Sequence, residues 1–225
     1  MDVPATPEIS AATTATPRRS KGKRTAERIL DAAEALFAQR GYAGATLRDV
    51  AAKVGLRTPS IYNHFPNKES LYAAVLERGI SPVLDVLTEV VEARDRSDRD
   101  VREIVERTMG LVGRRPNLPR LIQHETLSGG RHLTPMLREW VRQTFARAYE
   151  MVEASSAARR WEPDQFPLLV LAMYHVFVGY FAIAHVYKDL NGQDLLSQQA
   201  LAKQTRFFGD LVAALFEEEG ARQGR

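Results

Sequence analysis

Apolar residues recur at intervals of three and four along almost the whole chain after residue 20, and this spacing constrains the fold more than any other feature. The first such stripe comprises Ala26, Ile29, Leu30, Ala33 and Phe37. Because an α-helix has 3.6 residues per turn, a stripe with this spacing lies on one face of a helix and can be buried there. No segment shows the alternation of apolar and polar residues that is typical of a strand bounded by turns. We therefore predict an all-α fold.

The distribution of charge divides the chain into unequal parts. Residues 1–20 are rich in Ala, Thr and Pro and have the composition of a disordered tail. Residues 18–78 contain 12 Lys and Arg against 6 Asp and Glu, a net charge of +6, whereas the whole chain of 225 residues carries only +3. A basic block of this kind favours a polyanionic partner. We predict one domain over residues 22–80 and a larger one over residues 81–225.

The sequence offers little for catalysis or metal binding. It contains no Cys, which excludes disulfides and thiolate-bound zinc or iron–sulfur clusters. The five His residues lack metal-ligand spacing, and the sequence motifs of nucleophile elbows, phosphate loops, dinucleotide folds and zinc proteases are absent. We expect a protein that is not an enzyme, with no cofactor and no metal site.

One segment raises the question of a membrane. Residues 165–187 contain no Asp, Glu, Lys or Arg, and a helix of 23 residues is long enough to span a bilayer. Against a span, Pro167 lies near the start of the segment, and His175 and His185 lie within it. We favour a buried helix of a helical core, with no membrane partner. Because the N-terminus also lacks the pattern of a secretory signal, we expect a cytoplasmic protein.

Residues 46–68 have the layout of two short helices joined by a tight turn. Thr46 and Asp49 have the spacing of a capping box at the start of the first helix, and Gly55 can adopt the positive φ of the turn. Thr58 followed by Pro59 predicts an N-cap and the start of the second helix. The apolar residues spaced to hold the two helices together are Leu47, Val50, Ala51, Val54, Leu56 and Ile61. The layout is that of a helix-turn-helix, whose second helix enters the major groove of DNA.

The same region resembles the N-terminal domain of a known family. The residues that carry the resemblance are Ile29-Leu30-Asp31-Ala32-Ala33, Leu36-Phe37, Gly41-Tyr42, Thr46, Asp49-Val50-Ala51, Gly55 and the run from Ile61 to Leu71. Their spacing, with the ending Tyr-x-His-Phe-x-x-Lys, looks like the TetR family of transcriptional regulators over about residues 22–80. The resemblance implies an all-helical homodimer with an N-terminal DNA-binding domain, followed by a domain that binds a small effector and dimerises through its last two long helices.

The polar face of residues 46–68 is the candidate DNA contact. The outward residues of its second helix are small, polar or aromatic, which suits base edges and phosphates. Lys68 stands at the start of a fourth helix, where its charge and the helix N-terminus both favour a phosphate. A structural or solvent-facing role is the alternative for each residue, and above all for Thr46, Arg48 and His64. The predicted DNA-binding residues are Thr46, Arg48, Arg57, Thr58, Pro59, Ser60, Tyr62, Asn63, His64 and Lys68.

The connection to the second part of the chain is short. We predict a fourth helix over residues 67–79, ending at Gly79, and a further helix from Pro82 to Ala93. No Gly- or Ser-rich spacer separates them, so a change of packing in the second domain should move the helix-turn-helix.

The last two helices are the predicted dimer contact. The helix at 165–187 is apolar on more than one face and needs a second buried surface. The helix at 197–219 carries an apolar stripe of Leu201, Thr205, Phe208, Val212 and Leu215. Two copies of this pair would close into a four-helix bundle.

The effector site is the least specific prediction, because aromatic and Met residues at helical spacing are more often core than ligand contacts. His124 and His175 lie on otherwise apolar helices, and each needs a hydrogen-bond partner when buried, either a ligand or a neighbouring side chain. The candidate effector-binding residues are Met109, Leu121, His124, Trp140, Phe145, Tyr174, His175 and Phe177. The predicted function is a repressor that binds a palindromic operator as a homodimer and is released by a small hydrophobic effector. The alternative is a helix-turn-helix activator or DNA-binding protein without an effector.

Overall fold

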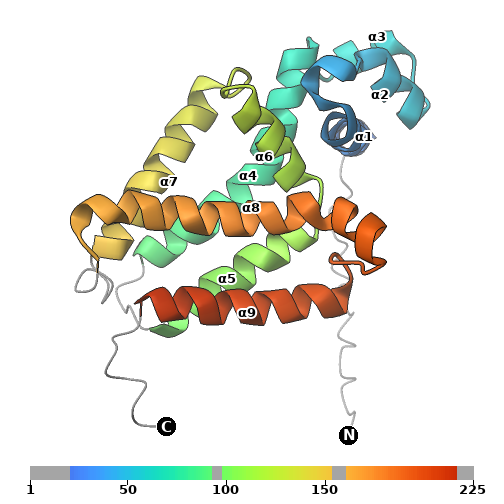
Figure 1. The fold of residues 1–225 in the computed structure, drawn as a ribbon. Coiled ribbons are helices and arrows are strands. Elements are labelled where there is room, and N and C mark those ends of the chain that lie inside the picture. Colours follow the sequence, from blue (N-terminus) through green and yellow to red (C-terminus); the bar gives the residue numbers. More distant parts are fainter. Residues whose placement is uncertain (1–20, 93–97, 154–160, 217–225) are drawn as a thin grey trace, which may run out of the picture.

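The computed structural model describes residues 21–92, 98–153 and 161–216, and the regular structure within these ranges is entirely helical. The predicted all-α fold is confirmed, with a small helix-turn-helix part at one corner and a larger helical part beside it (Figure 1). The predicted tail, residues 1–20, lies outside the described residues. The elements are α1 (Lys21–Gly44), α2 (Leu47–Val54), α3 (Thr58–Tyr62), α4 (Lys68–Glu92), α5 (Asp98–Gly113), α6 (Leu118–Leu127), α7 (Pro135–Glu153), the 3₁₀ turn η2 (Pro163–Gln165), α8 (Phe166–Asn191) and α9 (Gln198–Phe216).

The first part is built on a core that α1, α2 and α3 share with the first turns of α4. Phe37, Ile61 and Tyr72 are fully buried in it. The rings of Phe37 and Tyr72 meet edge to face with their centroids 4.9 Å apart, an arrangement that aromatic quadrupoles favour. Burial of each such side chain stabilises the fold by roughly 1.5–3 kcal/mol. Because α4 supplies part of this core, the helix-turn-helix and the start of α4 form one packed unit.

The prediction that the fourth helix ends at Gly79 is wrong. α4 continues through Gly79 and Pro82 as far as Glu92. Gly79 serves close packing, because a Cβ at this position would overlap Leu118 Cδ1 of α6. Pro82 costs a backbone hydrogen bond, but α1, α5, α6 and α7 all pack against α4, and this packing outweighs local propensity. The division at residue 80 therefore falls inside a continuous helix, and the two domains over 22–80 and 81–225 stay a prediction.

The local signals around α2 and α3 are largely confirmed. Thr46 and Asp49 form the capping box, and Gly55 has φ 69°. The prediction that Thr58 is an N-cap is wrong: Arg57 is the cap residue and Thr58 is already helical. Since Pro59 is tolerated anywhere in the first turn, where amide groups need no helical partner, it does not fix the first residue.

The second part surrounds its own core, in which Val105, Phe181 and Phe208 are buried. In Figure 1, α8 (orange) crosses the molecule above α9 (red), and α5 runs beside α9. α6 packs against both α1 and α8, so it connects this part to the helix-turn-helix.

Candidate nucleic-acid interface and ligand cavity

The turn of the helix-turn-helix is fixed by hydrogen bonds. The Leu56 N–H donates to the Ala51 carbonyl at 2.9 Å, directly after the left-handed Gly55. Arg28 of α1 donates from Nη2 to the Val54 carbonyl at 2.7 Å, which gives one of the last carbonyls of α2 a charged donor. Ile61 is completely buried beneath α3. The opposite side of α3 is therefore held facing solvent.

The ten predicted DNA-binding residues lie on α2, the turn, α3 and the first turn of α4, at the corner of the molecule opposite α9 (Figure 1). Tyr62 is 52% exposed, which is a large aromatic surface to leave in water. Six of the ten are exposed and four are half-buried, the exposed ones being Thr46, Arg48, Arg57, Pro59, Tyr62 and Asn63, and the others Thr58, Ser60, His64 and Lys68.

Thr46 uses its polar groups for capping. Its hydroxyl donates to Asp49 Oδ2 at 2.7 Å and accepts from the Asp49 N–H at 3.2 Å, while the Thr46 N–H donates to the same carboxylate at 3.1 Å. The hydrogen bonds from Thr46 hold the pKa of Asp49 below its ordinary value of 3.8. Thr46 thus positions the start of α2, and its contact with DNA stays a prediction.

Lys68 lies over an aromatic ring. Its Nζ is 4.3 Å from the centroid of Tyr42 and donates to the Ala43 carbonyl at 3.5 Å. Burial lowers the pKa of Lys68. An ammonium has three donors, so further donors stay available at the N-terminus of α4, where a phosphate is favoured.

The larger part of the molecule contains a cavity of about 570 Å³ lined by residues of α4 to α9. A volume of this size suits a small organic ligand. Four of the predicted effector-binding residues line it: Phe145, Tyr174, His175 and Phe177.

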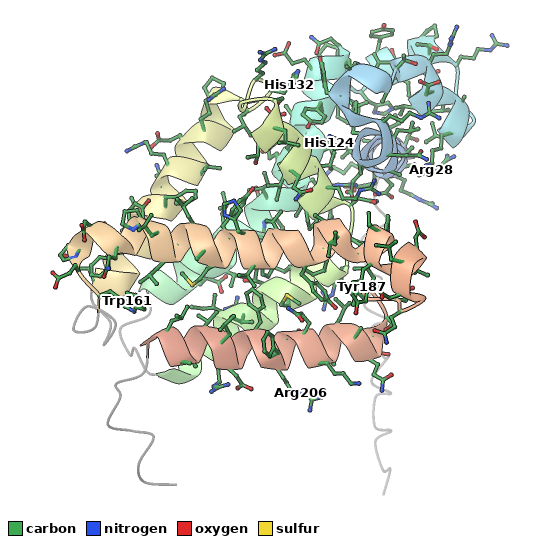
Figure 2. The ribbon with its side chains drawn as sticks, in the orientation of Figure 1. Arg28, His124, His132, Trp161, Tyr187 and Arg206 are labelled. Carbon is green, nitrogen blue, oxygen red and sulfur yellow. The ribbon has the colours of Figure 1, made fainter. Side chains whose placement is uncertain are left out.

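The other predicted effector-binding residues lie elsewhere. Met109 is buried in the core of the second part and Leu121 in the core of the first. His124 is on the side of α6 that faces α1, with Nδ1 near Gly41 (Figure 2). The side chain of Trp140 lies outside the described residues. Leu121 and His124 fail to line the cavity because they lie on the side of α6 that faces the first part, and Met109 is taken up by the core of the second part.

Glu125 is absent from the predicted residues, yet it lines the cavity and is only 4% exposed. Its Oε1 accepts from the His132 N–H at 2.6 Å, and its Oε2 lies 3.1 Å from His132 Nδ1. Burial first, and then the charge and hydrogen bond of Glu125, raise the pKa of the Tyr72 phenol. An acid beside His124 on an amphipathic helix normally faces solvent, so nothing local in the sequence indicates its burial.

His132 joins this acid to the helix-turn-helix. Its ring lies against Tyr42, with the centroids 3.8 Å apart, and near Tyr72 at 5.4 Å. Tyr42 in turn carries Lys68. A continuous row of contacts therefore leads from Glu125 in the cavity wall, through His132 and Tyr42, to Lys68 among the candidate DNA contacts.

An apolar surface covers the outer side of the last two helices. By length and composition, η2 and α8 together (Pro163–Asn191) could cross a membrane, and only 28% of the most apolar window is buried in the chain. The prediction of a buried helix therefore holds only for the side of α8 that faces the core. The exposed apolar residues are Leu168, Leu171, Val176, Ile183, Val186 and Leu190 of α8, with Phe207 and Leu211 of α9.

The predicted dimer stripe on the last helix is on the wrong face. Phe208 is 3% exposed and packs in the core of its own chain, with Val212, while Phe207 is 61% exposed. Because both faces of α9 carry apolar residues, periodicity alone could not tell which face turns inward.

Comparison with known proteins places both parts in one group. Residues 29–75 match the family described as "Bacterial regulatory proteins, tetR family", and residues 98–212, about half of the chain, match "Tetracyclin repressor-like, C-terminal domain".

Curated relatives match the helix-turn-helix part. The biofilm operon icaADBC HTH-type negative transcriptional regulator IcaR is 36% identical over 61 residues in Staphylococcus epidermidis and 35% over 65 residues in Staphylococcus aureus strain Newman. These matches cover 27% and 29% of this chain, and the chain spans about a third of the length of each relative (33%).

Solved structures share the whole fold. The fatty acid degradation regulator FadR from Bacillus halodurans superposes with a TM-score of 0.63 at 17% identity, over 87% of this chain and 96% of that one. A TetR-like transcriptional regulator from Rhodococcus sp. RHA1 gives a TM-score of 0.60 at 19% identity, over 92% and 100% of the two chains. At these identities the likeness concerns the fold alone.

Proposed function

The chain belongs to the tetR family of bacterial regulatory proteins and is a DNA-binding transcriptional regulator, and we propose that it is a repressor whose hold on DNA is released by a small molecule in the cavity. The observation that carries this proposal is the continuity of α4. Its first turns pack in the helix-turn-helix core, and its Leu76, Ile80 and Val83 line the cavity. The proposal that the protein represses transcription, and does not activate it, is supported by the negative regulators among the relatives.

The proposed DNA contact is the set of ten residues on α2, α3 and the start of α4. Tyr62 and Lys68 would bind phosphates, and Thr58 and Ser60 would face base edges in the major groove. Phosphate contacts fix the position of the protein on the duplex, whereas contacts to base edges select the sequence. The exposure of Tyr62 and the unused donors of Lys68 support these roles.

Operator binding tests this surface. The wild-type protein would select its site from a random duplex library, and the affinity of variants for that site would be titrated by electrophoresis. Tyr62→Ala and Lys68→Met should weaken binding to all sequences, and Lys68→Met should lower the salt slope by about one unit. Thr58→Ala should instead shift the base preference, at ~1–3 kcal/mol per lost contact. Arg206→Ala on α9, far from this corner in Figure 2, is the control. Wild-type affinity of both phosphate variants would refute the assignment.

Coupling of the two sites is proposed to run through α4 and through the row Glu125–His132–Tyr42. Cavity and helix-turn-helix share α4, and the row gives the cavity wall a second contact with α1. A ligand that moves α6 would tilt the helix-turn-helix. A coupling free energy of ~1–3 kcal/mol, which is typical of allosteric proteins, changes DNA affinity by roughly 5- to 150-fold.

His132→Phe separates coupling from DNA binding. The ring on Tyr42 is retained, but the Nδ1 contact with Glu125 is lost. The variant should bind the selected site within about fivefold of wild type, since one contact contributes ~1 kcal/mol or less here. It should respond more weakly to any hydrophobic compound that raises the melting temperature of the wild type and releases it from DNA. His124→Phe, on α6 next to Glu125 but outside the cavity lining, is the control.

Two copies are proposed to pair through the exposed apolar face of α8 and α9. The dimer would bind a palindromic operator, and the protein would be cytoplasmic. The two-fold axis of such a dimer sets two copies of α3 on successive turns of DNA. His175 and His185 are exposed on α8, which fits a protein contact better than a bilayer.

The second candidate function is an activator or DNA-binding protein without an effector. It would be favoured if ligands bound in the cavity and left affinity for the selected site unchanged.

A further inference from the structure

We infer that the ligand of the cavity is an uncharged, largely apolar molecule with one hydrogen-bonding group, and that this group meets the hydroxyl of Thr108. The inference rests on the proposed function, in which the cavity holds the effector. It names the chemical class of that effector and the residue of α5 that selects it.

The charges around the cavity disfavour ionic ligands. Its described lining contains neither Lys nor Arg, and Glu125 is the single acid there. Both oxygens of Glu125 are engaged by His132, and the carboxylate also bonds with Tyr72. A ligand carboxylate would be buried without a counter-charge, and a ligand ammonium would compete with donors already in place. Either loss exceeds what one hydrogen bond returns.

The other polar side chains in the described wall each have a partner within the chain. The Thr126 hydroxyl donates to the Ile122 carbonyl at 2.9 Å, so the Tyr174 hydroxyl, 3.1 Å away, is the donor to Thr126 Oγ1. His175 Nδ1 lies 2.7 Å from the Leu171 carbonyl. These groups have local partners on α6 and α8 and do not require a ligand.

Thr108 is different. It is 8% exposed, lines the cavity, and its Oγ1 has no hydrogen-bond partner among the described residues. A threonine in a helix can bond the carbonyl four residues earlier, as Thr126 and Thr205 do. Since buried hydroxyls are normally hydrogen-bonded, the Thr108 hydroxyl is the buried side-chain group in the described wall that has no partner and is free to meet a ligand.

Four probes with one ring system test the class: naphthalene, 2-naphthol, 2-naphthoate and 2-naphthylmethylammonium, titrated by calorimetry at pH 7. We expect 2-naphthol to bind tightest and the two ions weakest. Thr108→Val keeps the shape and removes the hydroxyl. It should lower the affinity for 2-naphthol about two- to tenfold, the effect of one hydrogen bond, and leave naphthalene unchanged. Thr205→Val, whose hydroxyl is bonded within α9 outside the cavity lining, should change neither affinity.

Thr108→Val also has a readout without ligand. Because it removes an unpaired buried hydroxyl, it should raise the melting temperature of the free protein, whereas Thr205→Val should not.

Tightest binding of 2-naphthoate or of the ammonium, or no binding by any probe, would overturn the inference, as would equal losses for naphthalene and 2-naphthol in Thr108→Val. The proposed function fails separately: 2-naphthol would then bind with these preferences and leave affinity for the selected DNA unchanged. If instead 2-naphthoate bound tightest and released DNA, the function would stand and the ligand class would be wrong.

Discussion

Arg78 of α4 and Glu34 of α1 form a nearly buried ion pair, with 2.7 Å between Nη2 and Oε2 and side chains only 14% and 11% exposed. Arg78 Nη1 also lies 2.7 Å from Asp31 and 3.2 Å from Glu27. One guanidinium on α4 thus binds three acids along one face of α1. Arg115, which follows α5, lies 3.6 Å from Glu34. The cluster fixes α4 against α1 at the point where α4 passes from one core to the other.

Arg78→Met should therefore destabilise the protein by about 3 kcal/mol, because it leaves Glu34 buried with only the more distant Arg115. The measurement is the free energy of unfolding in urea. Arg142→Met is the control, since Arg142 is 71% exposed in its pair with Glu139 and such pairs contribute less than ~1 kcal/mol. Equal losses in the two variants would show that the cluster is not a structural clamp.

Gly79 gives a second test of the same helix. An Ala here would gain helix propensity but press its Cβ against Leu118 of α6, whereas an Ala at Gly110 of α5 meets no atom within 4 Å. The propensity gain of roughly 1 kcal/mol is common to both changes. Gly79→Ala should thus be less stable than Gly110→Ala by about 1–3 kcal/mol, the usual range for overpacking. Thermal unfolding of the two variants measures the difference, and similar stabilisation in both would contradict the close contact.

The helix-turn-helix and α4 show why some features of the fold could be predicted from the sequence and others could not. The Thr46–Asp49 capping box and the turn at Gly55 depend on residues within a few positions, so spacing is enough to predict them. The path of α4 through Gly79 and Pro82 depends on four other helices, which spacing does not report.

In the candidate DNA contact and the cavity, too, the features that depend on nearby residues were predictable and those that depend on distant residues were not. The polar face of α3 follows from its buried Ile61 and is readable from periodicity. Glu125 contacts His132, and His132 contacts Tyr42, so this row joins α6, the segment before α7 and the end of α1, and no local pattern in the sequence links them. The cavity wall likewise draws on six helices, and only four of the predicted effector-binding residues line it.

The capping box predicts a pH effect. Thr46→Ala should cost about 1 kcal/mol at neutral pH, because the cap of α2 is lost. The pKa of Asp49 is lowered chiefly by hydrogen bonds from Thr46. A carboxylate with a lowered pKa contributes stability above its ordinary value of 3.8, and this contribution is lost as the pH falls through the folded-state pKa.

The difference in unfolding free energy between wild type and Thr46→Ala should therefore shrink as the pH falls from about 5 to about 2. Ser197→Ala provides the comparison, since Ser197 Oγ accepts from the Ala200 N–H at 3.3 Å in a cap that carries no such carboxylate bond in the described structure. Its cost should not depend on pH in this range. A Thr46→Ala difference that stays constant in acid would show that Asp49 gains nothing from the cap.

Two neighbouring residues on α9 separate the dimer contact from the core. Phe207 is 61% exposed within the apolar face of α8 and α9, while Phe208 is 3% exposed. Phe208→Ala should cost about 3–5 kcal/mol, as a large cavity in a core does. Phe207→Glu should leave the unfolding free energy of the protomer within ~0.5 kcal/mol, as surface changes usually do.

Phe207→Glu should nevertheless convert the protein to monomers, because a charge buried in an apolar interface is unfavourable in both copies. Light scattering at micromolar concentration measures this, with Arg206→Glu, an exposed position on the same helix, as the control that should stay dimeric. The monomer would bind one half-site through an intact α3, so its affinity for the selected palindrome should fall steeply while its affinity for a single half-site stays near that of wild type. A monomeric wild type, or a dimeric Phe207→Glu, would show that this face is not where two copies meet.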